Sequence, residues 1–213
     1  MIEGPWFIWM HFPKCAGSAT EAALRRLYLG KPGYTFDQPA PAWHENVAQR
    51  MKRVPGFAPG DRTIICNFRR LPSWIISRVR YEQSQPPHHA APREMFLSGR
   101  FFENDGSINT AEGYVKHYMA ANKWIRAEHL AEDFEKAFGV SAPIERVNET
   151  SPEVSDVRFH LSRDDIVRLY EICPTWAALE RKLYGSLAVE EAQSGWPSFA
   201  STPAGCGNQG RTA

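Results

Sequence analysis

Short apolar runs alternate along the chain with longer segments whose apolar residues recur at helical spacing. Two of the runs, at residues 6–12 and 63–68, have the length and the aromatic or β-branched content of buried strands. Each is followed by a segment with helical periodicity, at residues 18–29 and from Pro72 onward. A proline is well tolerated in the first turn of a helix. The pattern therefore predicts two successive strand–turn–helix units.

The remaining chain continues this alternation. It predicts a helix at residues 44–53, a helix at 110–122, a strand at 123–127, a helix at 130–138, and two C-terminal helices that Pro174 separates and Gly185 ends. Ser162 and Asp165 have the spacing of a capping box at the start of the first C-terminal helix. Residues 31–43 and 84–109 are rich in turn-forming and polar residues, which predicts a loop and a surface excursion over the site.

Strands that alternate with helices favour a parallel sheet covered by helices. We therefore expect an α/β protein with a single three-layer α/β/α domain around a central parallel sheet. The domain is expected to cover residues 1–189, followed by a disordered tail at 190–213, where Gly, Ser, Pro, Ala and Thr predominate. A chain of 213 residues is long enough for one such core.

The overall composition is that of a soluble globular protein, with 43% hydrophobic and 23% charged residues. A formal net charge of +1 gives no general attraction to nucleic acid or to a membrane surface, so neither partner is expected. The N-terminal residues lack the basic and apolar regions of a signal peptide, and no apolar stretch reaches the ~18 residues of a membrane span. The cysteines lack metal-ligand and CxxC spacing. These features predict a cytoplasmic protein with reduced thiols and no membrane span.

The turn after the first predicted strand carries the most informative chemistry. It comprises Lys14, Cys15, Ala16, Gly17, Ser18, Ala19 and Thr20. Small residues at the start of a helix leave backbone N–H groups and the positive end of the helix dipole open to an anion. The lysine precedes the glycine, whereas a Walker A loop ends in Gly-Lys-Ser/Thr. The segment therefore predicts an anion site unlike that of an NTPase, and Arg69, which follows the second strand, is expected to converge on the same ligand.

Two motifs resemble those of a known enzyme family. Residues 11–20, HFPKCAGSAT, resemble the 5′-phosphosulfate loop of sulfotransferases that use 3′-phosphoadenosine 5′-phosphosulfate (PAPS), which commonly reads HIPKTGGTS in the carbohydrate-type branch. Residues 69–77, RRLPSWIIS, resemble the 3′-phosphate motif of that family, commonly R-D-P-x-x-R-x-x-S. Residues 124–130 and 146–148 also resemble family landmarks, so the resemblance covers residues 6–185.

The resemblance implies a P-loop-like nucleotide-binding fold and a sulfotransferase activity. The sulfuryl group of PAPS would pass to a hydroxyl or amine of a small-molecule or carbohydrate acceptor, and no metal is implied. Lys14 would stabilise the oxygen that leaves sulfur. Ser18 and Thr20 would donate from their hydroxyls to the anionic groups of the donor.

The second motif and the general base leave alternatives open. Arg69 has the family's spacing to Ser77, and a phosphate must touch both, so Arg69 is favoured for the 3′-phosphate. Arg70 remains an alternative because its spacing to the proline matches the family. Family members use a histidine or a glutamate as the base between the two motifs, which makes His44 the first candidate and Glu45 the second.

Departures from the family pattern keep other functions open. Cys15 and Ala19 stand where the family usually has hydroxyl side chains. A non-catalytic nucleotide-binding protein of the same fold therefore remains an alternative. A P-loop-like kinase is the other alternative, although the chain lacks the Lys-Ser/Thr pair and the Walker B strand of such enzymes. His11 falls in the buried strand, which is typical of a structural histidine. His88 and His89 lie in a proline-rich segment without a spaced third ligand, so no metal site is expected there.

Overall fold

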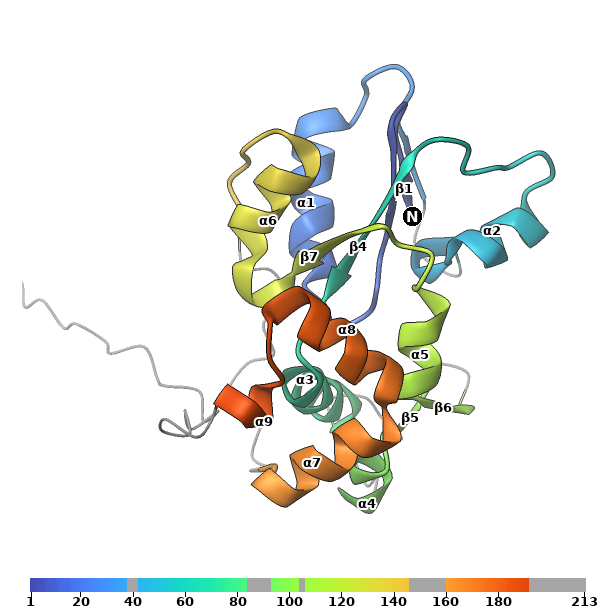
Figure 1. The fold of residues 1–213 in the computed structure, drawn as a ribbon. Helices are drawn as coiled ribbons and strands as arrows, with labels where there is room; N and C mark the ends of the chain where they lie inside the picture. Colours follow the sequence, from blue (N-terminus) through green and yellow to red (C-terminus); the bar gives the residue numbers. More distant parts are fainter. Residues whose placement is uncertain (38–41, 84–92, 104–105, 146–159, 192–213) are drawn as a thin grey trace, which may run out of the picture.

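The computed structural model describes residues 1–37, 42–83, 93–103, 106–145 and 160–191. Its elements, in chain order, are β1 (Ile2–Glu3), β2 (Phe7–Met10), α1 (Gly17–Tyr28), β3 (Thr35–Phe36), the 3-10 helix η1 (Ala42–His44), α2 (Val47–Arg53), β4 (Thr63–Phe68), α3 (Leu71–Gln83), α4 (Arg93–Leu97), β5 (Arg100–Phe102), β6 (Ile108–Thr110), α5 (Ala111–His117), β7 (Lys123–Arg126), the 3-10 helix η3 (Ala127–His129), α6 (Leu130–Phe138), α7 (Arg163–Ile172), α8 (Pro174–Tyr184) and α9 (Ala188–Glu191). Together they form an α/β fold around a mixed five-stranded sheet (Figure 1).

The central sheet has the strand order β3-β1-β2-β4-β7. Strands β2, β4 and β7 are parallel, with Ile8 opposite Ile64 and Cys66 opposite Trp124. This confirms parallel pairing for the two main apolar runs. Strand β1 pairs antiparallel with both β2 and β3, so the expectation of a wholly parallel sheet is wrong at this edge. A strand as short as β1 shows no periodicity in the sequence.

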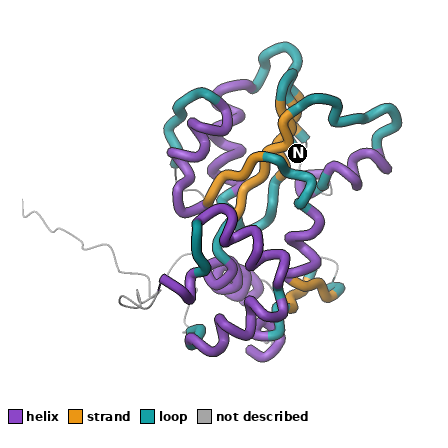
Figure 2. The backbone as a smooth tube through the Cα atoms, in the orientation of Figure 1, coloured by secondary structure: helices purple, strands orange, loops and turns teal. Residues whose placement is uncertain are grey.

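Strand β2 is buried on both of its faces. Phe7 and Trp9 belong to one core cluster with residues of α1 and α6, whereas Ile8 and Met10 belong to another with residues of α3, α5 and α8. A continuous apolar run is the pattern expected of a parallel strand that is covered on both faces. Figure 2 shows helices on both sides of the strands.

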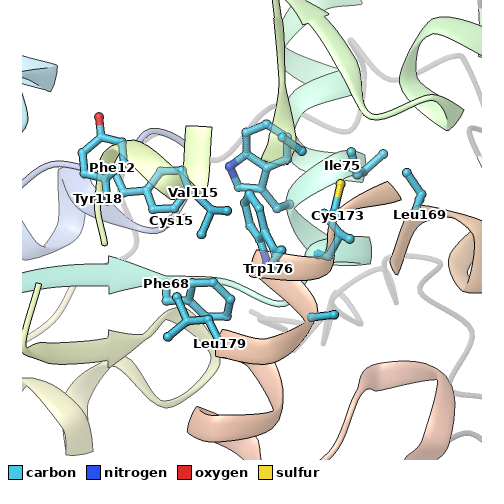
Figure 3. Close-up of a cluster of buried hydrophobic side chains, with 14 of the residues drawn as sticks. Phe12, Cys15, Phe68, Ile75, Val115, Tyr118, Leu169, Cys173, Trp176 and Leu179 are labelled. Carbon is cyan, nitrogen blue, oxygen red and sulfur yellow. The ribbon is translucent and has the colours of Figure 1, made fainter. Parts of the chain in front are cut away.

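Two buried tryptophans hold the turns that follow β2 and β4. The ring centroid of Trp176 on α8 lies 5.4 Å from that of Phe12 (Figure 3) and 5.0 Å from that of Trp74. The indole N–H of Trp176 donates to the carbonyl of Arg69 at 3.1 Å, and that of Trp74 donates to the carbonyl of Pro13 at 2.9 Å. Both tryptophans are fully buried, so the core fixes the backbone of both turns directly.

The segment predicted as a surface excursion contributes to the core. In its described part, α4 carries Phe96 and the β5–β6 hairpin carries Phe101, and both residues are 1% exposed. The Phe101 ring packs edge-on against Trp74, with 5.3 Å between the centroids. The prediction of a polar surface loop is wrong there, because these aromatic rings cover α3. The loop predicted at 31–43 likewise contains β3 and the start of η1.

The C-terminal predictions have mixed outcomes. The hydroxyl of Ser162 accepts the N–H of Asp165, and the Asp165 carboxylate accepts the N–H of Ser162, so the predicted capping box is confirmed. Helix α9 extends past residue 189, and residues 192–213 of the predicted tail lie outside the described residues.

Two other predictions concern the thiols and the membrane. Cys15, Cys66 and Cys173 are buried and free, in agreement with reduced thiols, and Cys206 lies outside the described residues. Within the described ranges, no helix has both the length and the apolar composition needed to cross a bilayer.

A buried carboxylate joins the C-terminal helices to the start of α3. Glu180 on α8 is fully buried and accepts the N–H of Leu71 at 2.9 Å, the hydroxyl of Tyr170 at 2.7 Å and the N–H of Ala188 at 3.0 Å. Arg70 pairs with the same carboxylate at 3.3 Å. Because a carboxylate at a helix N-terminus is stabilised by the helix dipole, Glu180 acts as the cap of α3.

Replacing Glu180 by alanine should destabilise the fold, because Arg70 and the N–H of Leu71 would lose a partner inside the core. We expect the free energy of unfolding to fall by about 3–5 kcal/mol, the cost of breaking a buried ion pair, as measured by urea denaturation. Glu171→Ala removes an exposed carboxylate on α7 and should leave the midpoint unchanged. Equal midpoints for the two variants would contradict a structural role for Glu180.

Candidate functional site

The turn between β2 and α1 has an uncommon backbone. Lys14 and Ala16 both have a φ of 64°, in the left-handed region that few residues other than glycine adopt. Ala16 is the N-cap of α1 and provides no side-chain cap, and the first turn of the helix has no acidic residue. The positive end of the helix dipole is therefore not neutralised by its own first turn. Such strained backbone next to a helix N-terminus is suited to an anion.

The ring of His11 fixes this turn against α1. A Cβ atom at Gly17 would lie 2.0 Å from Cδ2 and 2.1 Å from Nε2 of that ring, so the contact requires glycine. His11 is 4% exposed, and its ring stacks on Trp9 with 5.3 Å between the centroids. Burial lowers the pKa of His11 well below its usual value, so the ring is neutral. These surroundings are those of a structural histidine.

Three basic side chains gather beside the turn: Lys14, Arg69 and Arg78. Burial, reinforced by the charges of Arg78 and Arg69, lowers the pKa of Lys14 to about 8. The Lys14 ammonium lies 4.6 Å from the ring centroid of Tyr81, and the Arg78 guanidinium lies 5.3 Å from the same centroid. Arg78 pairs with Glu82 at 2.7 Å, but within the described residues neither Lys14 nor Arg69 has a salt bridge. Two cations without a salt-bridge partner among the described residues favour an anionic ligand.

The two arginines of the second motif have different surroundings. Arg70 pairs with Glu180 and with Glu191, and it thereby joins α3 to the C-terminal helices. The charge of Arg69 is close enough to Lys14 to lower the pKa of that lysine. The geometry therefore favours Arg69 over Arg70 as the residue that can bind an anion.

Three residues of the predicted loop have their side chains in the interior: Cys15, Ala19 and Thr20. Cys15 is fully buried, and burial raises the pKa of its thiol. Thr20 is also fully buried, and its hydroxyl donates to the carbonyl of Ala16 at 3.3 Å and accepts from Nδ2 of Asn67 at 2.8 Å. The Thr20 hydroxyl therefore stabilises the interior and does not bind a ligand, because it already both donates and accepts a hydrogen bond there. The hydroxyl side chains of the predicted set that are only partly buried are those of Ser18 and Ser77.

His44 lies in η1 with one ring nitrogen held by the backbone. Its Nδ1 is 3.1 Å from the carbonyl oxygen of His11. A carbonyl can only accept, so Nδ1 carries the hydrogen and Nε2 keeps its lone pair. Burial lowers the pKa of His44 below its usual value, so the ring is neutral at pH 7. The Tyr118 hydroxyl donates to the carbonyl of His44 at 2.9 Å and anchors η1. Nε2 can therefore accept a proton.

Glu45 is less suited to the role of a base. Its carboxylate pairs with Arg53 at 2.9 Å and with Arg50 at 3.0 Å. Nearby positive charge stabilises the ionised form of a carboxylate and so weakens it as a proton acceptor. Of the two predicted bases, the structure favours His44.

A pocket of about 380 Å³ lies beside His44. Its lining includes His44, Glu45, Glu103, Tyr114, His117 and Tyr118. Lys14 and Arg69 do not line it, but Arg78 is close to both groups of residues. The charge of Arg78 acts to lower the pKa of Lys14, of His44 and of Tyr114. The Arg78 guanidinium lies 5.3 Å from the centroid of the Tyr81 ring, which Lys14 also contacts. It also donates to the carbonyl of Phe102, next to the lining residue Glu103. The cation cluster and the pocket are therefore neighbours.

The sequence prediction did not include Arg78 or the pocket carboxylate Glu103. A signal for Arg78 exists, because Arg78 and Glu82 share a helix face with the buried residues Ile75 and Val79. Opposite charges four residues apart on an apolar face indicate a buried ion pair. Glu103 has no such signal, because its position depends on how the β5–β6 hairpin packs.

Several predicted positions cannot be compared with this geometry. His88, His89 and residues 146–148 lie outside the described residues. In the part of the chain that the structure describes, no three His, Cys, Asp or Glu side chains are grouped as metal ligands would be.

Comparison of the chain with models of protein families, with curated proteins and with solved structures finds no match. The function is therefore inferred from the geometry and the chemistry of the site.

Gly17→Ala should be destabilising, because the new methyl group would lie 2.0 Å from the His11 ring. We expect the free energy of unfolding to fall by about 1–3 kcal/mol, the cost of overpacking a core, as measured by chemical denaturation. The double variant His11→Ala/Gly17→Ala should lose less stability than the sum of the single variants, because it has no clash. Additive losses would contradict the close contact.

Proposed function

We propose that this protein is a PAPS-dependent sulfotransferase with a P-loop-like nucleotide site. The observation that carries the proposal is the position of Lys14 and Arg69, two cations without salt bridges in the described residues, after the parallel strands β2 and β4. Ligands of open α/β sheets bind beyond the carboxyl ends of such strands. PAPS carries a phosphosulfate at its 5′ position and a phosphate at its 3′ position, so it requires two separate cationic positions.

The residues of the two turns fit the two ends of this donor. Lys14 and the N-terminus of α1 suit the 5′-phosphosulfate, because a helix dipole and backbone N–H groups favour an anion. The guanidinium of Arg69 suits the 3′-phosphate, which it can bind with two parallel hydrogen bonds. Ser77 on α3 is half-buried and offers a hydroxyl for the same phosphate.

The side chains of this site have different roles in sulfuryl transfer. PAPS supplies an activated sulfuryl group, whose transfer resembles phosphoryl transfer in being in line and dominated by positioning and charge. Nε2 of His44 takes the proton of the acceptor hydroxyl while the acceptor oxygen bonds to sulfur. The Lys14 ammonium stabilises the negative charge on the oxygen released as the old S–O bond breaks. The products are a sulfate ester and 3′-phosphoadenosine 5′-phosphate, with the proton on His44.

The proposed nucleotide site should bind nucleotides that carry a 3′-phosphate more tightly than nucleotides that lack it. In isothermal titration calorimetry, we expect 3′-phosphoadenosine 5′-phosphate to bind about tenfold or more tightly than adenosine 5′-diphosphate, because a hydrogen bond to a charged group contributes about 1.5–3 kcal/mol. Arg69→Gln should remove most of this difference, because the 3′-phosphate loses its cationic partner.

Arg168→Gln is the matched control, because Arg168 is exposed on α7 and its loss leaves the site intact. Equal binding of the two nucleotides by the native protein would contradict the proposal. Magnesium-dependent turnover of ATP would favour a kinase instead.

Turnover should depend on His44, whereas nucleotide binding should not. His44→Gln should lower kcat about 100-fold or more, as expected for the loss of a general base, in an assay of 3′-phosphoadenosine 5′-phosphate release with hydroxylated acceptors. Because the pKa of His44 lies below its usual value, the native rate should persist at neutral pH and fall in acid, where the ring becomes protonated. An unchanged kcat in a variant with native nucleotide affinity would exclude His44 as the base.

A further inference from the structure

The pocket beside His44 has an unbalanced charge. In the described part of the chain, its lining residues include two carboxylates, Glu45 and Glu103, and no lysine or arginine. The carboxylate of Glu45 is already paired with Arg50 and Arg53. Glu103 is therefore the pocket carboxylate whose charge can be balanced by a bound ligand.

Two neutral donors orient Glu103. Its Oε1 accepts from Nδ2 of Asn109 at 2.7 Å, and its Oε2 accepts from the hydroxyl of Tyr114 at 3.0 Å. Burial, with Glu103 beside it, raises the pKa of Tyr114, so the phenol remains a donor. Each oxygen of a carboxylate can accept more than one hydrogen bond. Glu103 is thus held in place and keeps the capacity to accept from a ligand.

Arg78 is close to this region, but its charge is already engaged. Its guanidinium pairs with Glu82 at 2.7 Å, donates to the carbonyl of Phe102, and lies 4.4 Å from the ring centroid of Phe101. Arg78 is 5% exposed, so packing holds it on α3. Among the residues that the structure describes, Glu103 has no salt-bridge partner.

We propose that this pocket binds the acceptor and that the acceptor is a small hydroxylated amine, with its hydroxyl at Nε2 of His44 and its ammonium at Glu103. The assignment rests on the proposed function, which gives His44 the role of base. An ammonium balances the charge of Glu103 and donates charge-assisted hydrogen bonds to it. An acceptor that carries a carboxylate would face Glu103 with no cation from the described lining to offset the repulsion.

The size and the walls of the pocket agree with such a ligand. A volume of about 380 Å³ suits one small molecule. The amides of Asn46 and Gln49 line the pocket and can hydrogen-bond to hydroxyl groups, and the ring of Tyr118 provides an aromatic wall.

Three sugars that share a hydroxylated ring and differ in charge test this selectivity. D-glucosamine, D-glucose and D-glucuronate are titrated by calorimetry into the full chain, alone and with 3′-phosphoadenosine 5′-phosphate. D-glucosamine should bind about tenfold more tightly than D-glucose, and D-glucuronate should bind more weakly than either. Equal affinities, or binding of none of the three, would overturn the proposal.

Glu103→Gln keeps the size of the side chain and removes its charge, so it should abolish the preference for D-glucosamine over D-glucose. Glu132→Gln removes an exposed carboxylate on α6 and should keep the full preference. Thermal melting checks that both variants fold. The preference of the native protein for D-glucosamine tests the proposal without any variant. A preference that persists in a folded Glu103→Gln protein would overturn the assignment of Glu103.

The same titrations separate this inference from the proposed function. A preference for the amine without binding of 3′-phosphoadenosine 5′-phosphate would support the pocket and contradict sulfuryl transfer. Tight binding of the nucleotide without any preference for the amine would support the nucleotide site and overturn the pocket proposal.

Discussion

The contact between the His11 ring and Gly17 determines the geometry on which the whole site depends. Because the ring occupies the space of a side chain at residue 17, the end of β2 and the start of α1 approach closely, and the residues between them turn through two left-handed positions. The carbonyl of His11 also accepts from Nδ1 of His44, whose own carbonyl accepts from the hydroxyl of Tyr118. The end of one strand therefore orients both the candidate anion site and the candidate base.

The core stabilises an arrangement that is unfavourable on its own. Left-handed backbone and neighbouring cations both cost free energy. The indole N–H groups that hold the carbonyls of Pro13 and Arg69 come from fully buried rings, so the turns cannot relax without disturbing the core. Glu180 pairs with Arg70, whereas Arg69 has no salt bridge within the described residues and can bind a ligand. A bound anion would relieve the repulsion that the packing maintains.

Sequence patterns predict the parts of this molecule that depend on neighbours along the chain. Strands β2 and β4, the helices after them and the Ser162 capping box follow from local periodicity and local hydrogen bonds. Strand β1 and the aromatic hairpin escape prediction because packing against distant segments stabilises them. Within the site, Lys14 and Arg69 are predictable because they follow strand ends. The choice of Arg69 over Arg70 depends on Glu180, far along the chain, and the pocket forms only when η1, α5 and the hairpin meet.

The low pKa of Lys14 would couple the proposed anion binding to proton uptake. With a pKa of about 8, the amine is partly deprotonated in mildly alkaline solution, and an anion beside it favours the charged form. Binding then removes a proton from the buffer, so the heat of binding includes the ionisation enthalpy of that buffer. Above pH 8 the affinity falls by up to about tenfold per pH unit. A change in alkalinity alone would therefore release an anion from this turn, without any movement of the chain.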